Sequence, residues 1–201
     1  MAIKDRKRVD DHYSRKARQE GFPARSVYKL EEIDQKFKLI KPGQAVLDLG
    51  CAPGSWTLYA AGIVGPKGRV IGVDLNPVEG TFPPQVTILQ ADLLTSPRTL
   101  VENDGPFDLV LSDMAPKTMG RREVDQARSL ELCQMAWVWA ESLLKPGGHF
   151  VFKIFQSQDG DDFIRTLKSR FSQISRLKPK ATRSESLETF IVGRGYKGPG
   201  L

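Results

Sequence analysis

Apolar positions along the chain fall into short continuous runs that alternate with stretches of helical spacing. The continuous runs predict strands at residues 45–49, 69–74, 86–92, 107–113 and 149–155. Apolar residues three and four apart predict helices over 22–40, 56–63, 128–144 and 161–172. Two further strands are predicted near 175–178 and 188–192, joined by a short segment without a helix. Residues 114–126 have no apolar period and are predicted to form a loop.

This alternation predicts the fold class. Strands that alternate with helices form a doubly wound, Rossmann-like α/β sheet that is mostly parallel, with right-handed crossovers. The final pair fits a hairpin, so we expect the last of seven strands to run antiparallel to the rest. With 201 residues, one domain is expected. We place it at 21–195, after a basic and partly ordered arm at 1–20 and before a tail at 196–201.

The charge of the chain is unevenly distributed. Residues 1–41 carry 12 Lys and Arg against 7 acids (+5), and residues 165–201 carry 9 against 2 (+7), so a net charge of +6 leaves −6 for the middle. Two basic ends around an acidic centre favour a polyanion-binding surface, although surface cations can also serve only for solvation. Nucleic acid is therefore the expected partner.

Composition also bears on the compartment. No apolar run approaches the roughly 18 residues of a membrane span, and the charged amino end is not followed by a hydrophobic segment. Two cysteines, Cys51 and Cys133, are too few for a disulfide framework. We therefore expect a cytoplasmic protein with reduced thiols and no membrane partner.

The segment VLDLGCAPGSW at 46–56 predicts a strand, a glycine-bearing turn and a helix. Such a turn lies at the ligand edge of a parallel sheet. Twenty residues past Gly54, a second apolar strand ends on Asp74, which can accept hydrogen bonds from ribose hydroxyls. Pro53 has no N–H with which to hold a pyrophosphate. The turn therefore favours S-adenosylmethionine over a dinucleotide, and a nicotinamide-dependent oxidoreductase stays open as the alternative.

Charged residues converge on the same predicted edge. Asp74, Asp92 and Asp113 end three strands, and Lys153 interrupts the apolar run FVFKIF in another. An antiparallel last strand would begin where the parallel strands end, which brings Glu188 to this edge. Lysine is seldom buried without a partner, so Lys153 is the strongest single candidate for chemistry.

The motifs GCAPGSW, VDLNP, LSDMAP, LKPGG and FKIF, with RSVYKL and ESLETF, resemble the FtsJ/RrmJ family of RNA ribose 2′-O-methyltransferases. The likeness runs in order from about residue 12 to 192. It implies the class I methyltransferase fold and a catalytic series that falls on Lys29, Asp113, Lys153 and Glu188. It further implies an S-adenosylmethionine site at Gly50, Pro53, Gly54, Trp56, Asp74, Asp92 and Asp113. Cys51 and Ser55 depart from the commonest family turn, but both are small.

The implied reaction explains these residue types. A ribose hydroxyl must attack a sulfonium methyl group in line and lose its proton, and alignment lowers the barrier by several kcal/mol. No metal is required. We assign Lys153 as the general base. Burial and the like charge of Lys29 favour its neutral form, whereas Asp113 and Glu188 oppose it, so an alternative is a charged Lys153 that steers the hydroxyl.

The resemblance also narrows the substrate. Because it is compact, this chain resembles the bacterial-type members, which modify a uridine of large-subunit (23S) ribosomal RNA within the ribosomal subunit. Transfer RNA is the second candidate substrate. A non-catalytic RNA-binding module is a third possibility that the complete Lys-Asp-Lys-Glu series opposes. A monomer is expected. The expected phosphate contacts are Arg25, Arg121, Arg122, Lys178, Lys180 and Arg183, with basic residues of 4–18.

Overall fold

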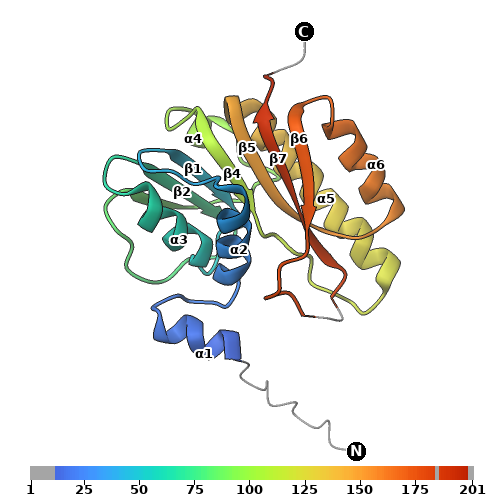
Figure 1. Ribbon diagram of the computed structural model, residues 1–201, viewed down its shortest axis with the longest axis horizontal. Helices are drawn as coiled ribbons and strands as arrows, with labels where there is room; N and C mark the ends of the chain where they lie inside the picture. The colour runs from blue at the N-terminus through green and yellow to red at the C-terminus, as the bar shows by residue number, and fades with distance from the viewer. Residues whose placement is uncertain (1–11, 184–185, 199–201) are drawn as a thin grey trace, which may run out of the picture.

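A computed structural model describes residues 12–183 and 186–198, and its centre is a seven-stranded sheet (Figure 1). The strand order is β3-β2-β1-β4-β5-β7-β6. All neighbours are parallel except β7, which is antiparallel to both β5 and β6. The strands are β1 (Ala45–Leu49), β2 (Arg69–Asp74), β3 (Val86–Gln90), β4 (Phe107–Ser112), β5 (Leu144–Phe155), β6 (Phe171–Leu177) and β7 (Glu188–Tyr196). The predicted mostly parallel sheet with an antiparallel last strand is confirmed.

Helices cover both faces of the sheet, which gives two separate apolar cores. One core packs α2 and α3 against the sheet, and the other packs α5 and α6 on the opposite face. Every residue of β1 is buried, as a central parallel strand between two helical layers requires. The helices are α1 (His12–Gln19), α2 (Val27–Phe37), α3 (Ser55–Val64), α4 (Thr99–Glu102), α5 (Arg122–Leu143) and α6 (Gln158–Leu167).

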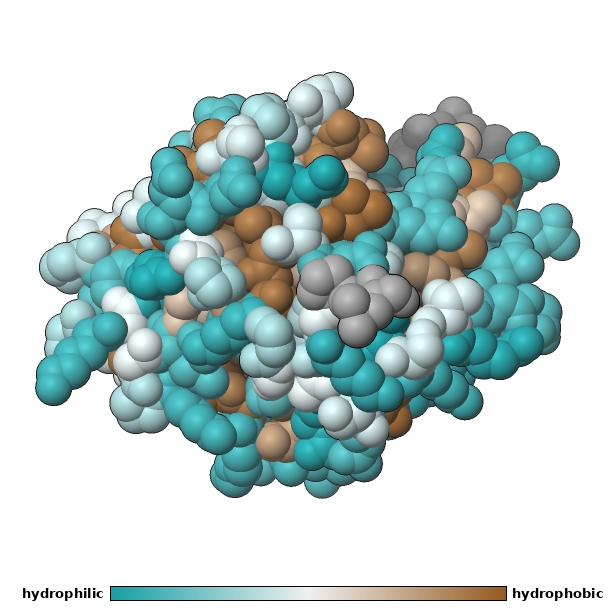
Figure 2. All heavy atoms as spheres, turned by 90° about the horizontal axis from the view of Figure 1, so that it is seen from above, coloured by the Kyte–Doolittle hydropathy of each residue, from teal (hydrophilic) through white to brown (hydrophobic). Residues whose placement is uncertain are grey.

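The two ends of the sheet differ in their roles. The parallel strands begin at the upper edge in Figure 1, where β7 ends, and they finish at the lower edge, where β7 begins. Figure 2 looks onto the upper edge, where hydrophilic side chains surround smaller apolar patches. The strand ends that carry the predicted acids lie at the lower edge, beside α1 and the segment that precedes β7.

The predicted loop at 114–126 is too long and the predicted helix start at 128 is too late, because α5 begins within the predicted loop. The helix begins at Arg122, six residues earlier than expected. Arg122 and Glu123 in its first turn are exposed polar residues, so the sequence has no apolar periodicity there that would predict a helix. Glu123 and Asp125 lie in this turn, and Asp125 accepts a hydrogen bond from the Met119 N–H at 2.8 Å. Acidic side chains stabilise a helix N-terminus.

The carboxyl-terminal elements also differ from prediction. Strand β5 starts at Leu144 rather than at 149, and its pairing with β4 shifts register between Phe107 and Leu109. Helix α6 ends at Leu167, and Phe171 begins β6 instead of lying in the helix. Strand β7 continues through Tyr196, which pairs with Phe171. The aromatic cluster of Trp137, Phe171 and Tyr196 explains this extension, since burial of aromatic side chains outweighs local propensity.

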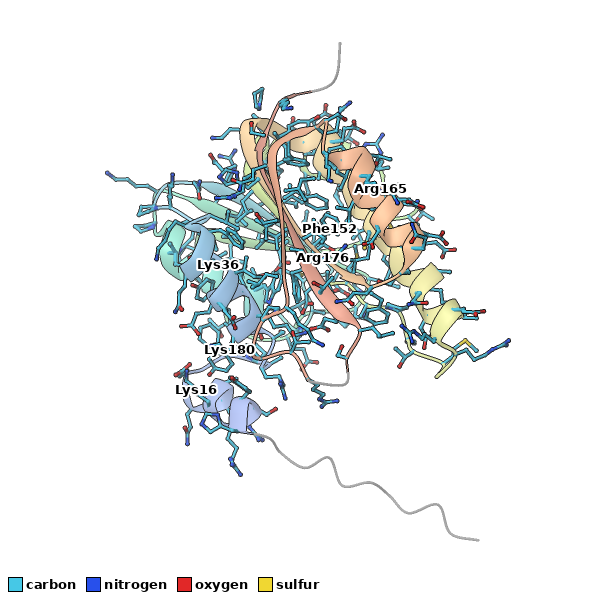
Figure 3. All side chains as sticks on the ribbon, turned by 45° about the vertical axis from the view of Figure 1, so that its right-hand side comes forward. Lys16, Lys36, Phe152, Arg165, Arg176 and Lys180 are labelled. Atoms are coloured by element: carbon cyan, nitrogen blue, oxygen red, sulfur yellow. The ribbon has the colours of Figure 1, made fainter. Side chains whose placement is uncertain are left out.

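Helix α1 falls inside the predicted arm, of which residues 1–11 lie outside the described residues. Ala17 and Tyr28 of the first two helices are buried with Ala181 from the segment between β6 and β7. Figure 3 shows Lys16 and Lys180 near each other on this side of the molecule. The amino-terminal helix and the β6–β7 segment thus form one surface beside the lower edge. Neither α1 nor the short α4 was predicted.

Candidate functional site

Four charged side chains from four elements meet at the lower edge of the sheet. Lys29 comes from α2, Asp113 follows β4, Lys153 lies near the end of β5, and Glu188 begins β7. The Lys29 Nζ lies 2.5 Å from Glu188 Oε1 and 3.9 Å from Asp113 Oδ1. The Lys153 Nζ lies 2.9 Å from the same Asp113 Oδ1. The structure therefore brings together all four residues of the predicted catalytic series.

Lys153 is the most buried member of this group. Its side chain is 5% exposed, and Nζ donates a hydrogen bond to the main-chain carbonyl of Asp113 at 2.5 Å. A lysine in such surroundings needs acceptors, because an isolated buried ammonium would be very costly. The Asp113 carbonyl and carboxylate supply them. The prediction that an apolar strand carries a partnered lysine is consistent with this geometry.

The carboxylate of Asp113 has an unsatisfied oxygen. Its Oδ1 is buried and accepts no hydrogen bond from any described residue. Both lysine ammoniums lie within ion-pair distance of it, but neither contact has hydrogen-bond alignment. A buried acceptor without a donor costs about 1–3 kcal/mol. At Asp113 Oδ1 the charges of the two nearby ammoniums compensate this cost.

Glycines allow the turn after β1 to approach its neighbours closely. Gly50 has φ +75°, and a Cβ there would come within 2.1 Å of Met114 Cγ. Gly54 has φ +102° and caps the start of α3, and a Cβ there would come within 2.7 Å of Phe82 Cζ. Gly50 lines the two cavities beside this turn, whereas Gly54, which was also predicted to bind the cofactor, lines neither of them.

A cavity of about 460 Å³ opens beside this turn at the ends of β1, β2 and β4. The predicted residues Gly50, Asp74, Asp92 and Asp113 all line it. Asp74 also organises the walls, because its carboxylate accepts hydrogen bonds from the Ala52 N–H at 2.9 Å and the Asn76 N–H at 2.8 Å. Sequence reasoning missed the other lining residues, Ala52, Leu75, Asn76, Leu93, Leu94, Met114, Ala115, Leu132 and Met135.

A second, much smaller cavity of about 30 Å³ lies between the turn and α2, which is room for about one water molecule. Pro53 and Trp56 line it, together with Asp113. The Trp56 Nε1 donates to the Ser26 carbonyl at 2.8 Å, which ties α3 to the start of α2. The lining also includes Asp48. Sequence reasoning missed this residue because the sequence does not show which side chains surround an acid inside a strand.

Asp48 is buried within β1, with a side chain that accepts a hydrogen bond from Thr57 Oγ1 at 2.6 Å. Burial raises the pKa of this carboxyl to about 7, the Thr57 hydrogen bond acts in the opposite direction, and the charges of Asp113 and Asp74 raise it further. The carboxyl is thus poised to exchange a proton near neutral pH, beside the group that contains Lys153.

A third cavity of about 360 Å³ adjoins the four charged residues on the side of α1. Arg25 and Arg183 line it together with Lys29 and Glu188. Burial lowers the pKa of Arg25, the like charge of Arg183 lowers it further, and Glu188 raises it. The two guanidiniums therefore lie where a negatively charged group would relieve their repulsion.

The remaining predicted cations lie on two separate surfaces. Lys178 and Lys180 are exposed beside this third cavity, and the Lys178 Nζ donates to the Ser186 carbonyl at 2.8 Å. Arg121 and Arg122 are exposed at the start of α5. The predicted contacts from 4–11 lie outside the described residues.

The described residues contain no cluster of His, Cys, Asp or Glu suited to a metal ion. Across residues 12–183 and 186–198, no helix combines the length and apolar character needed to cross a membrane. Thr182 is a further residue of the site that the sequence did not reveal. Its Oγ1 donates to Glu188 Oε1 at 3.3 Å, so it helps to hold the carboxylate that pairs with Lys29.

Comparisons with known proteins identify the family of the chain. A family model described as FtsJ-like methyltransferase matches residues 22–196. A protein of Nitratidesulfovibrio vulgaris named ribosomal RNA large subunit methyltransferase E is 50% identical over 195 residues, which cover 96% of each chain. A protein of the same name from Bdellovibrio bacteriovorus is 53% identical over 191 residues, which cover 93% of this chain and 97% of that one.

A solved structure has the same architecture. The crystal structure described as a ribosomal RNA methyltransferase from Plasmodium falciparum superposes with a TM-score of 0.77 at 26% identity, covering 89% of this chain and 100% of that one. The family match spans the strands, the glycine turn and all four charged residues of the site. The chain therefore belongs to the FtsJ-like methyltransferase family.

Proposed function

We propose that this chain transfers a methyl group from S-adenosylmethionine to a ribose 2′-hydroxyl of RNA. The observation that carries the proposal is the buried Lys153 Nζ, which lies 2.9 Å from Oδ1 of Asp113, a residue that also lines the cavity of about 460 Å³. In its neutral form this amine has the lone pair that can accept the proton of a substrate hydroxyl. Membership of a methyltransferase family supports methyl transfer as the type of reaction.

The chemistry of the larger cavity suits S-adenosylmethionine. Its volume of about 460 Å³ falls within the range of about 300–1,000 Å³ that is usual for small-molecule pockets. Leu132 and Met135 provide apolar contact for a purine, and the carboxylates of Asp74 and Asp92 can accept hydrogen bonds from hydroxyl and amino groups. When bound, the donor supplies an electrophilic methyl carbon on a positively charged sulfonium.

The four charged residues orient the hydroxyl and receive its proton. The carbonyl and Oδ1 of Asp113 occupy two directions around the Lys153 Nζ, which leaves a third for the substrate. Lys153 is the proposed general base, and its neutral amine would accept the hydroxyl proton. Lys29, held by Glu188, places a positive charge where negative charge develops on the attacking oxygen.

We assign the substrate to a uridine of large-subunit ribosomal RNA. Relatives at about 50% identity that carry this name over nearly their full length support the assignment. The cavity lined by Arg25 and Arg183 supports a phosphate position next to the reacting hydroxyl. Phosphate contacts of this kind position a nucleic acid rather than read its sequence.

The test compares the wild type with Lys153→Ala and with the control Lys168→Ala, which removes an exposed lysine at the end of α6. Methyl transfer from labelled S-adenosylmethionine is measured on ribosomal subunits, on free ribosomal RNA and on transfer RNA, and the modified positions are mapped. We expect Lys153→Ala to lower turnover by about 10²–10⁴-fold, the usual contribution of a general base, and Lys168→Ala to leave it unchanged.

Calorimetry separates loss of chemistry from loss of the cofactor. The affinity of Lys153→Ala for S-adenosylmethionine should stay within about twofold of that of the wild type, because Lys153 does not line the cavity of about 460 Å³ that we assign to this molecule. NAD should not bind either protein. Wild-type turnover in Lys153→Ala would refute the mechanism, and a methyl group found on a base would refute the assignment to the ribose.

A further inference from the structure

Strand β4 leaves the sheet just before Asp113, so the end of β5 loses a neighbour. The last residue of β4, Ser112, pairs with Phe152. Beyond this point, residues 153–155 keep only β7 as a strand partner. The same departure that delivers Asp113 to the site thus exposes one side of the β5 backbone at Lys153.

The register of β5 and β7 shows which backbone groups face away from β7. The Gln156 N–H donates to the Leu187 carbonyl at 3.1 Å. Hydrogen-bonded pairs alternate along an antiparallel ladder, so residues 152 and 154 also bond to β7. The N–H and C=O groups of Lys153 and Phe155 therefore point away from β7, toward the space that β4 has left.

Two side chains of α5 fill this space. The Cys133 Sγ–H donates to the Lys153 carbonyl at 3.0 Å, and the Phe155 N–H donates to Ser129 Oγ at 3.0 Å. Ser129 and Cys133 lie four residues apart on one face of the helix, with exposures of 1% and 3%. They bond to the Lys153 carbonyl and the Phe155 N–H on the side of β5 that β4 has left.

The thiol is in the right state for this contact. Burial raises the pKa of Cys133 to about 12, while the charge of Lys153 and the Ser129 hydrogen bond act in the opposite direction. The group is therefore protonated at neutral pH and can donate. An unpaired carbonyl at this buried point would leave the strand end free to bend.

We propose that Ser129 and Cys133 are positioning residues for the methyl transfer proposed above, on which this inference rests. They fix the end of β5 so that the Lys153 ammonium reaches the carbonyl and carboxylate of Asp113. A displacement of about 1 Å at a reacting group can cost about a hundredfold in rate, so a small bend of β5 is sufficient to reduce turnover.

Single substitutions on α5 test this role. Cys133→Ala and Ser129→Ala each remove one bond to β5, and Cys133→Ser restores a donor. Ser142→Ala is a matched control, because this hydroxyl bonds only to carbonyls of its own helix. Ala136→Gly, at a buried position of the same helix, is a second control that should lower Tm without removing a bond to β5. Measurements are kcat, KM for each substrate, the Kd of S-adenosylmethionine and Tm.

We expect each loss-of-bond variant to lower kcat by about 5- to 50-fold, with KM and Kd for S-adenosylmethionine within about twofold. Cys133→Ser should recover most of kcat, and both controls should keep it. If Cys133→Ala fails to fold, the same measurements are made on Cys133→Val, whose side chain fills a similar volume but has no hydrogen-bond donor. The inference is overturned if the variants keep kcat, if Ala136→Gly loses as much, or if Cys133→Ser recovers nothing.

The outcome for the wild type separates this inference from the proposed function. A wild-type protein that transfers no methyl group to a ribose hydroxyl would refute the proposed function and this inference with it. An active wild type whose variants behave like Ser142→Ala would refute only the positioning role.

Discussion

The buried carboxyl of Asp48 makes the stability of this protein depend on pH in an unusual direction. Its pKa of about 7 in the folded chain lies above the value of about 3.9 expected in the unfolded chain. The folded state therefore holds the proton more tightly. The resulting stabilisation is complete below about pH 4 and is lost as the pH rises to about 7.

The size of this effect follows from the difference between the two pKa values. About 1.4 kcal/mol is lost per pH unit, so the interval from about pH 4 to pH 7 removes about 4 kcal/mol. The full figure applies because the side chain is only 1% exposed. Asp48→Asn keeps the shape of the side chain but cannot ionise, so it should remove this dependence.

Urea unfolding of the cofactor-free wild type and Asp48→Asn between pH 5 and pH 8 measures the effect. The difference in unfolding free energy should move in favour of the variant by about 1.4 kcal/mol per pH unit up to about pH 7, and then level off. Asp162→Asn, which removes an exposed carboxylate of α6, is the control for loss of one acid. A difference that stays constant from pH 5 to pH 8 would refute the reasoning.

Two further predictions concern the RNA surface and the carboxyl terminus. Lys180→Gln and Arg183→Gln should each weaken RNA binding and reduce the slope of log affinity against log salt by about 0.7–0.9, measured by fluorescence anisotropy; an unchanged slope would exclude a phosphate contact. Tyr196→Ala should lower the free energy of unfolding by about 3–5 kcal/mol, because the buried ring packs against Phe171 and Trp137. Urea denaturation measures this change, and a decrease of less than about 1 kcal/mol in the free energy of unfolding would contradict the prediction.

The sequence predicts the strands best where both faces are buried. Strand β1 is apolar at nearly every position because helices cover both of its sides, and the acids Asp74 and Asp113 mark the strand ends beside it. Their common position at one edge follows from the rule that parallel strands end together. The reversed direction of β7 follows from the hairpin, and it places Glu188 with them.

Other features depend on contacts that a sequence pattern cannot contain. The first turn of α5 is stabilised by Asp125 and its bond to Met119, in a segment without an apolar period. The end of β7 is fixed by the pairing of Tyr196 with Phe171. Which face of α5 lines the cofactor cavity depends on how that helix packs, so Leu132 could not be assigned to the cavity in advance.

The ion pair between Lys29 and Glu188 joins the second helix to the last strand. The residues that line the larger cavity lie between 50 and 135, so they emerge early during synthesis. The group of four charged residues also requires Glu188, which begins β7. A chain that ended before β7 would therefore keep the residues that line the larger cavity but would lack Glu188, the ion-pair partner of Lys29.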